Sequence, residues 1–258
     1  MSQPRLSQLD TWSKMEKKIH TVLDQALDLL TREDELPEQE NKITRKLYFC
    51  LLRADRNLKR SSTLWHSLPP PYCEANNQPF AEDEEKSTRE DKRPDVQYGF
   101  YDEDEPDDLL SAKQYIIECK RLGKKVRSNW ALNENYIQYG IMRFISEEHA
   151  YGKGVRSGAM IGYVQNMEPE DILSEVNAAA IAQHLQTLSD PSIMLSEDGW
   201  KESNTSQLRS EFERTFPYSP FLLYHFWVDL RTHYLPSNSI TQSENSFVKH
   251  KETPDENP

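Results

Sequence analysis

Two predicted strands and an acidic turn lie in residues 93–120, RPDVQYGFYDEDEPDDLLSAKQYIIECK. Apolar residues alternate with polar residues or glycine through residues 95–101, a pattern typical of a strand with one buried face. After the turn at residues 102–108, the β-prone run Tyr115-Ile116-Ile117 continues into Glu118-Cys119-Lys120. These features predict a hairpin or two neighbouring strands.

Charged residues stand at the ends of these two strands. Residues two apart in a strand project from the same face, so Glu118 and Lys120 share a face, and Asp95 at the start of the other strand can reach it. Two converging carboxylates provide the hard oxygen ligands that Mg²⁺ or Mn²⁺ prefers. The Cys119 side chain is expected in the core, while its carbonyl is a further candidate metal ligand. Lys120 is placed to position water or to neutralise charge in a transition state.

The motif Pro94-Asp95, followed by Glu118-Cys119-Lys120, resembles that of the PD-(D/E)XK nuclease superfamily, which has the restriction-endonuclease-like fold. That superfamily also has an acid on a preceding helix, and Glu40 fits this position. The resemblance covers about residues 37–164 in the order helix, strand, strand, helix, strand. It implies that Asp95 and Glu118 hold Mg²⁺ or Mn²⁺, that Lys120 is catalytic and that Glu40 is an accessory acid near the metal.

Helical periodicity dominates the N-terminal part of the chain. Apolar residues recur at steps of three and four from Leu6 to Leu30, which predicts an amphipathic helix. A second helix is expected from Pro37, in its first turn, to about Leu58. Its predicted buried stripe contains Leu36, Glu40, Ile43, Leu47, Leu51 and Ala54, with Cys50 alongside.

The remaining pattern predicts an α/β (α+β) chain, and the resemblance implies a restriction-endonuclease-like core in which a mixed central sheet is flanked by helices. N-terminal helices precede this core and a C-terminal α/β extension follows it. The expected organisation is an N-terminal helix at 1–35, a nuclease-like domain at 36–235 with a loop insertion at about 61–93, and a disordered tail at 236–258. Within the domain we expect a helix at 134–146 capped by Asn133, a strand at 160–164 and a helix at 168–188.

Charge is distributed unevenly along the chain. The net charge of −12 argues against a protein that coats nucleic acid, because neutralising phosphates requires Lys and Arg. Residues 113–165, however, contain nine Lys or Arg and only four acids, which suits local phosphate contact. Ordinary patchiness is the alternative interpretation. The candidate nucleic-acid contacts are Arg143, Lys124, Lys125, Lys153 and Arg156.

Two of these candidates lie in features with competing interpretations. Arg143 shares a helix face with Tyr136 and Gly140 and could clamp a phosphate, although a packing face with a surface Arg is an equal alternative. The glycine-rich stretch at 152–158 lacks the GKS or GKT ending of a phosphate loop and precedes a predicted strand. It therefore does not predict nucleotide hydrolysis.

Composition points to a reducing compartment. The three cysteines form no CxxC pair and no cluster at zinc spacing, and residues 1–10 lack a basic segment followed by an apolar one. We therefore expect a cytoplasmic protein. The longest apolar runs are too short to span a bilayer, so no membrane partner is expected.

Three functional hypotheses follow. The leading one is a Mg²⁺- or Mn²⁺-dependent nuclease that acts on DNA as the effector or a subunit of a multi-protein, defence-type system, with protein partner subunits or as a homodimer. The second is a catalytically degenerate nuclease-fold interaction subunit of a larger complex. In the third, the motif is a coincidence within an unrelated α+β domain.

Overall fold

Six strands form one mixed sheet in the order β1-β2-β3-β4-β6-β5. The computed structural model describes residues 6–79, 85–103, 105–125, 131–185 and 204–234. The strands are β1 (Tyr72–Cys73), β2 (Val96–Tyr101), β3 (Ala112–Leu122), β4 (Ser157–Val164), β5 (Thr205–Phe212) and β6 (Phe221–Asp229). The helices are α1 (Leu6–Thr31), α2 (Glu40–Ser61), α3 (Asp108–Ser111), α4 (Leu132–Tyr136), α5 (Met142–Ile145) and α6 (Pro169–Ala182), with the short segments η1 (Thr88–Asp91), η2 (Ile137–Ile141) and η3 (Arg231–His233).

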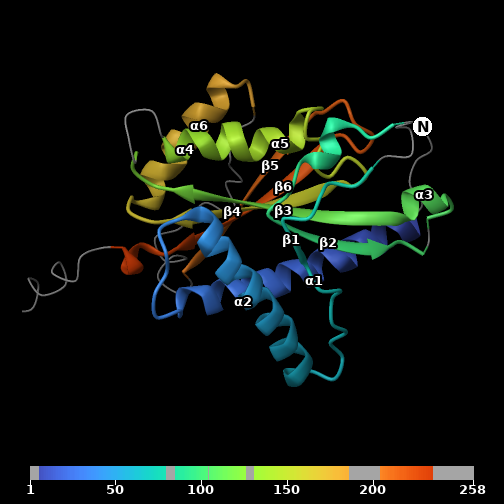
Figure 1. Cartoon of the computed structure of the whole chain (residues 1–258), viewed down its shortest axis with the longest axis horizontal. Coiled ribbons are helices and arrows are strands. Elements are labelled where there is room, and N and C mark those ends of the chain that lie inside the picture. The colour runs from blue at the N-terminus through green and yellow to red at the C-terminus, as the bar shows by residue number, and fades with distance from the viewer. Residues whose placement is uncertain (1–5, 80–84, 104, 126–130, 186–203, 235–258) are drawn as a thin grey trace, which may run out of the picture.

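The sheet has a helical layer on each face. Figure 1 shows α1 and α2 on one side and α4, α5 and α6 on the other. Alternate residues of β3 serve the two layers: Ile117 and Cys119 join the core built with α1 and α2, whereas Ile116 and Leu122 join the core under α4 and α6. The expectation of a mixed α/β protein with a central sheet flanked by helices is therefore confirmed.

Strand pairing places the two motif strands side by side. β2 and β3 are antiparallel, with Val96 opposite Ile117, as the hairpin prediction required. β3 and β4 are parallel, and the chain crosses between them through α4, η2 and α5. Every residue of β4 is buried, as expected for a strand covered on both faces.

Helix α1 belongs to the same core as the sheet. Its Ile19 and Val22 are fully buried with residues of β3, β4 and β6. Glu16 accepts hydrogen bonds from Ser157 of β4 and from Tyr224 of β6, the latter at 3.2 Å. The boundary expected at residue 35 therefore does not separate two hydrophobic cores.

Helix α2 differs from its predicted bounds. It begins at Glu40 and continues to Ser61, so Pro37 precedes the helix and the prediction that it occupies the first turn was wrong. The buried stripe of the helix is otherwise as predicted, except that Thr44 is added, Glu40 is partly exposed, and Leu36 is buried but precedes the helix. Glu40 is the first helical residue, and its side chain is partly exposed because that end of the helix lies at the rim of the sheet.

Other boundaries differ as well. The helix after β3 begins at Leu132, and Asn133 accepts a hydrogen bond from the Gly123 amide, so Asn133 is not the cap. Helix α6 ends at Ala182, and residues 186–188 of the predicted helix lie outside the described residues. The tail expected to be disordered at 236–258 also lies outside them.

The predicted loop insertion and the C-terminal part both contribute to the sheet. The two-residue strand β1 within the loop pairs with β2. Strands β6 and β5 extend the sheet beyond β4, so the C-terminal part completes the central sheet. Within the described part of the chain, no helix is long and apolar enough to cross a membrane.

Candidate active site

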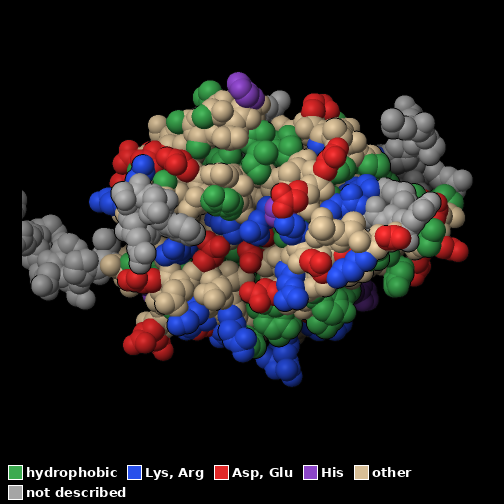
Figure 2. Space-filling model, turned by 45° about the horizontal axis from the view of Figure 1, so that its top comes forward, with side chains coloured by type: hydrophobic (Ala, Val, Ile, Leu, Met, Phe, Trp, Pro, Cys, Tyr) green, Lys and Arg blue, Asp and Glu red, His purple; other side chains and the backbone are tan. Residues whose placement is uncertain are grey.

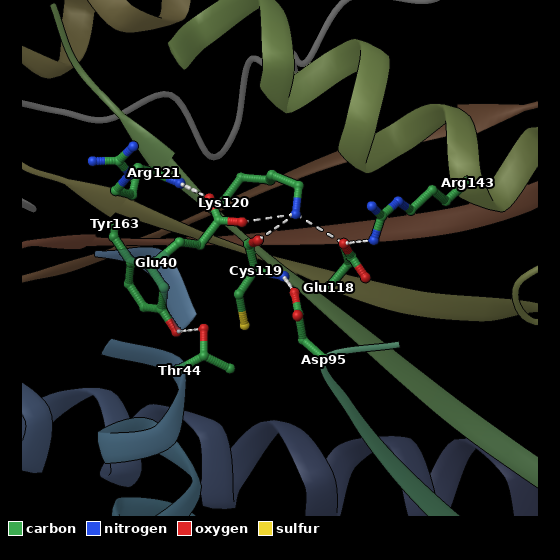
Figure 3. A network of polar contacts seen from close by, with 9 residues as sticks. All are labelled: Glu40, Thr44, Asp95, Glu118, Cys119, Lys120, Arg121, Arg143 and Tyr163. Carbon is green, nitrogen blue, oxygen red and sulfur yellow. Dashed lines mark hydrogen bonds and ion pairs between the residues drawn. The ribbon is translucent and has the colours of Figure 1, made fainter. Parts of the chain in front are cut away.

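Glu118 is the central residue of a polar network on the α4–α5 side of β3 (Figure 3). Its side chain has no exposed surface. One carboxylate oxygen, Oε1, accepts from Lys120 Nζ at 2.8 Å and from the guanidinium of Arg143. The other oxygen, Oε2, is buried and has no hydrogen-bond partner among the described residues.

Lys120 connects several parts of this network. Its Nζ donates to Glu118 Oε1, to the Cys119 carbonyl at 2.8 Å and to Glu40 Oε1 at 3.1 Å. The side chain is only 9% exposed, so the ammonium has exchanged water for fixed oxygen partners. Because the Cys119 carbonyl already accepts from Lys120, its predicted role as a metal ligand requires sharing or replacing that hydrogen bond.

Asp95 approaches from the neighbouring strand. Its Oδ2 accepts from the Cys119 amide at 2.7 Å. Val96 and Ile117 are the last paired residues of β2 and β3, so Asp95 and Glu118 are the next positions of the same antiparallel register. Residues directly opposite each other in such a pair have Cβ atoms about 5 Å apart. The structure therefore brings the two predicted carboxylates together.

Glu40 reaches the network from the opposite helical layer. One carboxylate oxygen accepts from Lys120 and the other from the Arg121 amide at 3.1 Å. The side chain is 35% exposed, because the first residue of α2 lies at the rim of the sheet. Glu40 therefore contacts Lys120, but the burial that led to its selection from the sequence is not observed.

Burial and mutual repulsion shift the ionisation of these groups. Burial, with a contribution from Asp95, raises the pKa of Glu118 to about 8, against the opposing effect of Lys120 and Arg143. Burial also raises the pKa of Asp95. For Lys120, burial works to lower the pKa, but Glu118, Asp95 and Glu40 outweigh it and raise the pKa. Lys120 is thus a cation throughout the neutral range.

A π-helical segment positions the helix over the site. Residues 137–141 form η2 between α4 and α5, and such bulges occur frequently at functional sites. Gly140 in this segment faces β3, and Arg143 one turn later reaches Glu118. The predicted shared face of Tyr136, Gly140 and Arg143 is present, because the Tyr136 hydroxyl also points to the sheet, where it contacts His225 and Trp227.

The charges leave room for a further cation. Three carboxylates, Asp95, Glu118 and Glu40, face two cations, Lys120 and Arg143. The unpartnered Oε2 of Glu118 is a free acceptor at this point. No group of three or more His, Cys, Asp or Glu side chains in metal-binding arrangement exists among the described residues. The residues that could hold a divalent cation here are Asp95 and Glu118, with water needed to complete the coordination shell.

Comparison with known proteins adds no relative. No protein-family model matches the chain, and neither does any curated protein or solved structure. The function of this site must therefore be argued from its own geometry.

The other predicted nucleic-acid contacts fall into two separate groups. Lys124 and Lys125 are exposed just beyond the end of β3. Lys153 and Arg156 precede β4, which is parallel to β3, so they lie toward the other end of the sheet. Arg156 also lies over the ring of Tyr218 at 5.6 Å. The structure does not join these four residues into one basic surface.

The contact between Arg143 and Glu118 was missed from sequence. Arg143 was predicted to face a phosphate, but its guanidinium pairs with the buried carboxylate while 28% of its side chain remains exposed. No local sequence signal could identify this pair, since the two residues lie on different elements. The observed position leaves Arg143 partly exposed beside the buried Glu118.

Proposed function

We propose that this chain is a metal-dependent nuclease that hydrolyses phosphodiester bonds in DNA. The observation that carries the proposal is the grouping of Asp95, Glu118 and Lys120 at two adjacent strands, with Glu118 Oε2 buried and unpartnered. A buried carboxylate oxygen without a partner is costly, and a cation bound by Asp95 and Glu118 would supply a partner for it. The three residues are those of the motif that resembles the PD-(D/E)XK nucleases.

In this proposal Asp95 and Glu118 hold Mg²⁺ or Mn²⁺, which supplies a more acidic bound water and polarises a phosphoryl oxygen. Hydrolysis joins the water oxygen to phosphorus and breaks a phosphorus–oxygen bond of the backbone. Lys120 acts as a cation in this step, because its raised pKa makes it a poor base. Its ammonium is suited to stabilise the negative charge that develops on the phosphate oxygens.

Glu40 and Arg143 support the same step from either side. Glu40 accepts from Lys120 and from the Arg121 amide, which holds the ammonium close to Glu118. Arg143 remains partly exposed, and its guanidinium can exchange the Glu118 carboxylate for a phosphate of similar geometry. We therefore propose Glu40 as a positioning residue and Arg143 as a contact to the DNA backbone.

A second candidate function is a nuclease-fold interaction subunit without catalysis. The observation that favours it is the double neutralisation of Glu118 by Lys120 and Arg143, which gives the cluster a structural role as a buried ion network. In that case the site would retain its geometry but not bind a divalent cation.

The first experiment is cleavage of supercoiled plasmid DNA with Mg²⁺, Mn²⁺ or EDTA. We expect metal-dependent cutting by the wild-type protein and loss of at least about a hundredfold in rate for Glu118→Gln and for Lys120→Met. Glu170→Gln and Lys17→Met change exposed residues of α6 and α1 and serve as matched controls. Equal cutting by the site variants would contradict the proposal.

The same chain is proposed to depend on protein partners for target choice. Its net charge of −12 opposes tight independent binding to DNA. We propose that it acts within a defence-type multi-protein system, in which another subunit selects the DNA. Site-specific cutting by the purified chain alone would contradict this part. The interaction-subunit function is favoured by a different result. In that case the wild-type chain does not cut DNA even with its partners, and a partner binds the Glu118→Gln variant as well as it binds the wild type.

A further inference from the structure

The outer face of α2 carries a regular row of exposed basic and apolar residues. The basic stripe, as we name it, consists of Lys42, Arg45, Phe49, Leu52, Arg56 and Arg60. Successive members are three or four residues apart, so they line one side of the helix over about 27 Å. Phe49 is 47% exposed and Leu52 is 37% exposed, which places two large apolar side chains in the middle of the row.

The cations of the stripe are available for a partner. Lys46 and Arg53, on the side of α2 that faces α1, are paired with Glu33. By contrast, the four cations of the stripe form no ion pair within the described part of the chain, and Arg45 only lies over the Phe49 ring at 5.7 Å. An exposed apolar centre framed by charge marks an interaction surface.

A surface of opposite charge lies at the tip of the β2–β3 ribbon. The acidic tip, as we name it, consists of Tyr101, Glu103, Asp107, Asp108, Leu109 and Leu110. Tyr101 is 77% exposed and Leu109 is 73% exposed. The tip therefore combines three carboxylates with large apolar side chains, and it complements the stripe in both charge and hydrophobicity.

One molecule cannot bring these two surfaces together. Figure 1 places α3 at the far end of the β2–β3 ribbon, away from the lower half of α2. Figure 2 shows hydrophobic side chains among Lys and Arg at the lower edge of the molecule, and hydrophobic side chains beside Asp and Glu at its right-hand end. Contact between the two surfaces must therefore involve two molecules.

We propose that the acidic tip of one copy of this chain docks on the basic stripe of a second copy. Charge opposition together with exposed apolar residues on both sides favours this occupant over a nucleic acid, whose phosphates gain nothing from Phe49 and Leu52. The contact joins different surfaces of the two molecules, so the first copy retains a free stripe and the second a free tip, and the assembly can grow head to tail. This proposal is independent of the nuclease function.

The two patches are small, with six residues on each side, so the association is weak and favoured by low salt. Sedimentation velocity of the full chain at up to a few hundred micromolar measures it. We expect the average mass of the wild-type protein to rise with concentration at about 50 mM salt and to return to the monomer at about 0.5 M salt.

Charge reversal provides the specific test. Arg45→Glu/Arg56→Glu alters only the stripe, and Glu103→Lys/Asp108→Lys alters only the tip while keeping the Asp107 carboxylate that accepts from the Leu109 amide. Each variant alone is expected to be monomeric. An equimolar mixture is expected to stop at a dimer, because one intact tip and one intact stripe remain.

A control variant, Lys17→Glu/Lys125→Glu, changes the net charge as much as the stripe variant does, on exposed residues elsewhere, and is expected to associate like the wild type. A wild-type protein that remains monomeric, or a mixture that remains monomeric, overturns the proposal. The proposal is also overturned if the wild-type protein does not self-associate but binds a duplex oligonucleotide or anionic lipid vesicles, and Arg45→Glu/Arg56→Glu abolishes that binding. This result would assign the stripe to another partner.

Discussion

Gly140 lies directly against the side chain of Lys120. A Cβ atom at position 140 would be 3.3 Å from Lys120 Cγ and 2.5 Å from the terminal methyl of Met160. The methionine methyl can move aside, but the lysine stem is held by the three partners of its ammonium. The absence of a side chain at Gly140 thus allows the π-helical segment to approach the site closely.

Gly140→Ala is expected to lower the DNA cleavage rate by about tenfold, because a shift of a few tenths of an ångström in Lys120 moves its charge away from the reacting phosphate. Stability should change little, since alanine gains up to about 1 kcal/mol in a helix and the contact costs a similar amount. Single-turnover cleavage and urea unfolding measure the two effects. Gly154→Ala, where a Cβ meets nothing within 4 Å, is the control and should cleave normally.

Arg143→Gln is expected to increase the affinity for Mn²⁺ by about tenfold in the absence of DNA, which corresponds to about 1.4 kcal/mol. The reason is that the guanidinium pairs with the same carboxylate that is proposed to bind the ion. Isothermal titration calorimetry measures the change. Arg121→Gln removes a cation that bonds the Glu38 carbonyl and should leave the affinity unchanged. An unchanged affinity in Arg143→Gln would show that Glu118 is not a metal ligand.

Arg214→Met is expected to lower the free energy of unfolding by about 3 kcal/mol. The buried guanidinium donates to the carbonyl oxygens of Phe144, Tyr151, Gly152 and Val155, and it lies 3.8 Å from the Phe221 ring centre. Removing it takes one donor away from each of these four buried carbonyl oxygens.

Urea unfolding measures this loss, and Arg214→Lys should recover only part of it, since an ammonium cannot reproduce the planar fork. Arg32→Met is the control. Its ion pair with Asp28 is exposed, so a change below about 0.5 kcal/mol is expected. A loss for Arg214→Met as small as for Arg32→Met would contradict the assignment of Arg214 as a structural clamp.

His225 is expected to make stability depend on pH below neutrality. Burial lowers the pKa of this histidine from 6.5 to about 3, while Tyr136 and Ser210 occupy its two ring nitrogens. The unfolded chain therefore binds a proton between pH 6.5 and 3 that the folded chain does not. This contribution to stability is complete above pH 6.5 and is lost as the pH falls.

His225→Gln should accordingly be less stable than the wild type at pH 7, and the difference should shrink by about 1.4 kcal/mol per pH unit between pH 6 and 4. Urea unfolding at each pH measures the difference. His66→Gln, at an exposed position, should show no such trend. A difference in stability that stays constant with pH would contradict this prediction, because it would mean that the folded and unfolded chains bind protons equally at His225.

The part of the site that could be predicted from sequence follows from the alternation of side chains between the two faces of a strand. That alternation alone places Glu118 and Lys120 on one face and Cys119 on the other, and β3 has this arrangement. Asp95 was placed near this face because β2 and β3 follow each other in the sequence, and they pair as antiparallel neighbours. These contacts are local in the sheet, and the pattern of apolar residues determines them.

The unpredicted features depend on the relative position of separate elements. The contact of Arg143 with Glu118 arises from the register of the π-helical segment on the sheet, which no spacing in the sequence specifies. The position of Glu40 arises from the point at which α2 begins. Strands β5 and β6 were expected as an extension. The place of β6 in the central sheet depends on its pairing with β4, which joins distant residues, and β5 is added through its pairing with β6.

The bonds of Glu16 to Ser157 and Tyr224 govern the order in which the molecule can assemble during synthesis. Tyr224 is translated 208 residues after Glu16. At about 5–20 residues per second, the ribosome delivers it roughly 10–40 s later. During that interval helix α1 has an apolar stripe but no strand β6 to cover it. Helix α1 can therefore pack on α2 soon after synthesis, but it reaches its partners in β6 only after β2, β3, β4 and β5 have been translated.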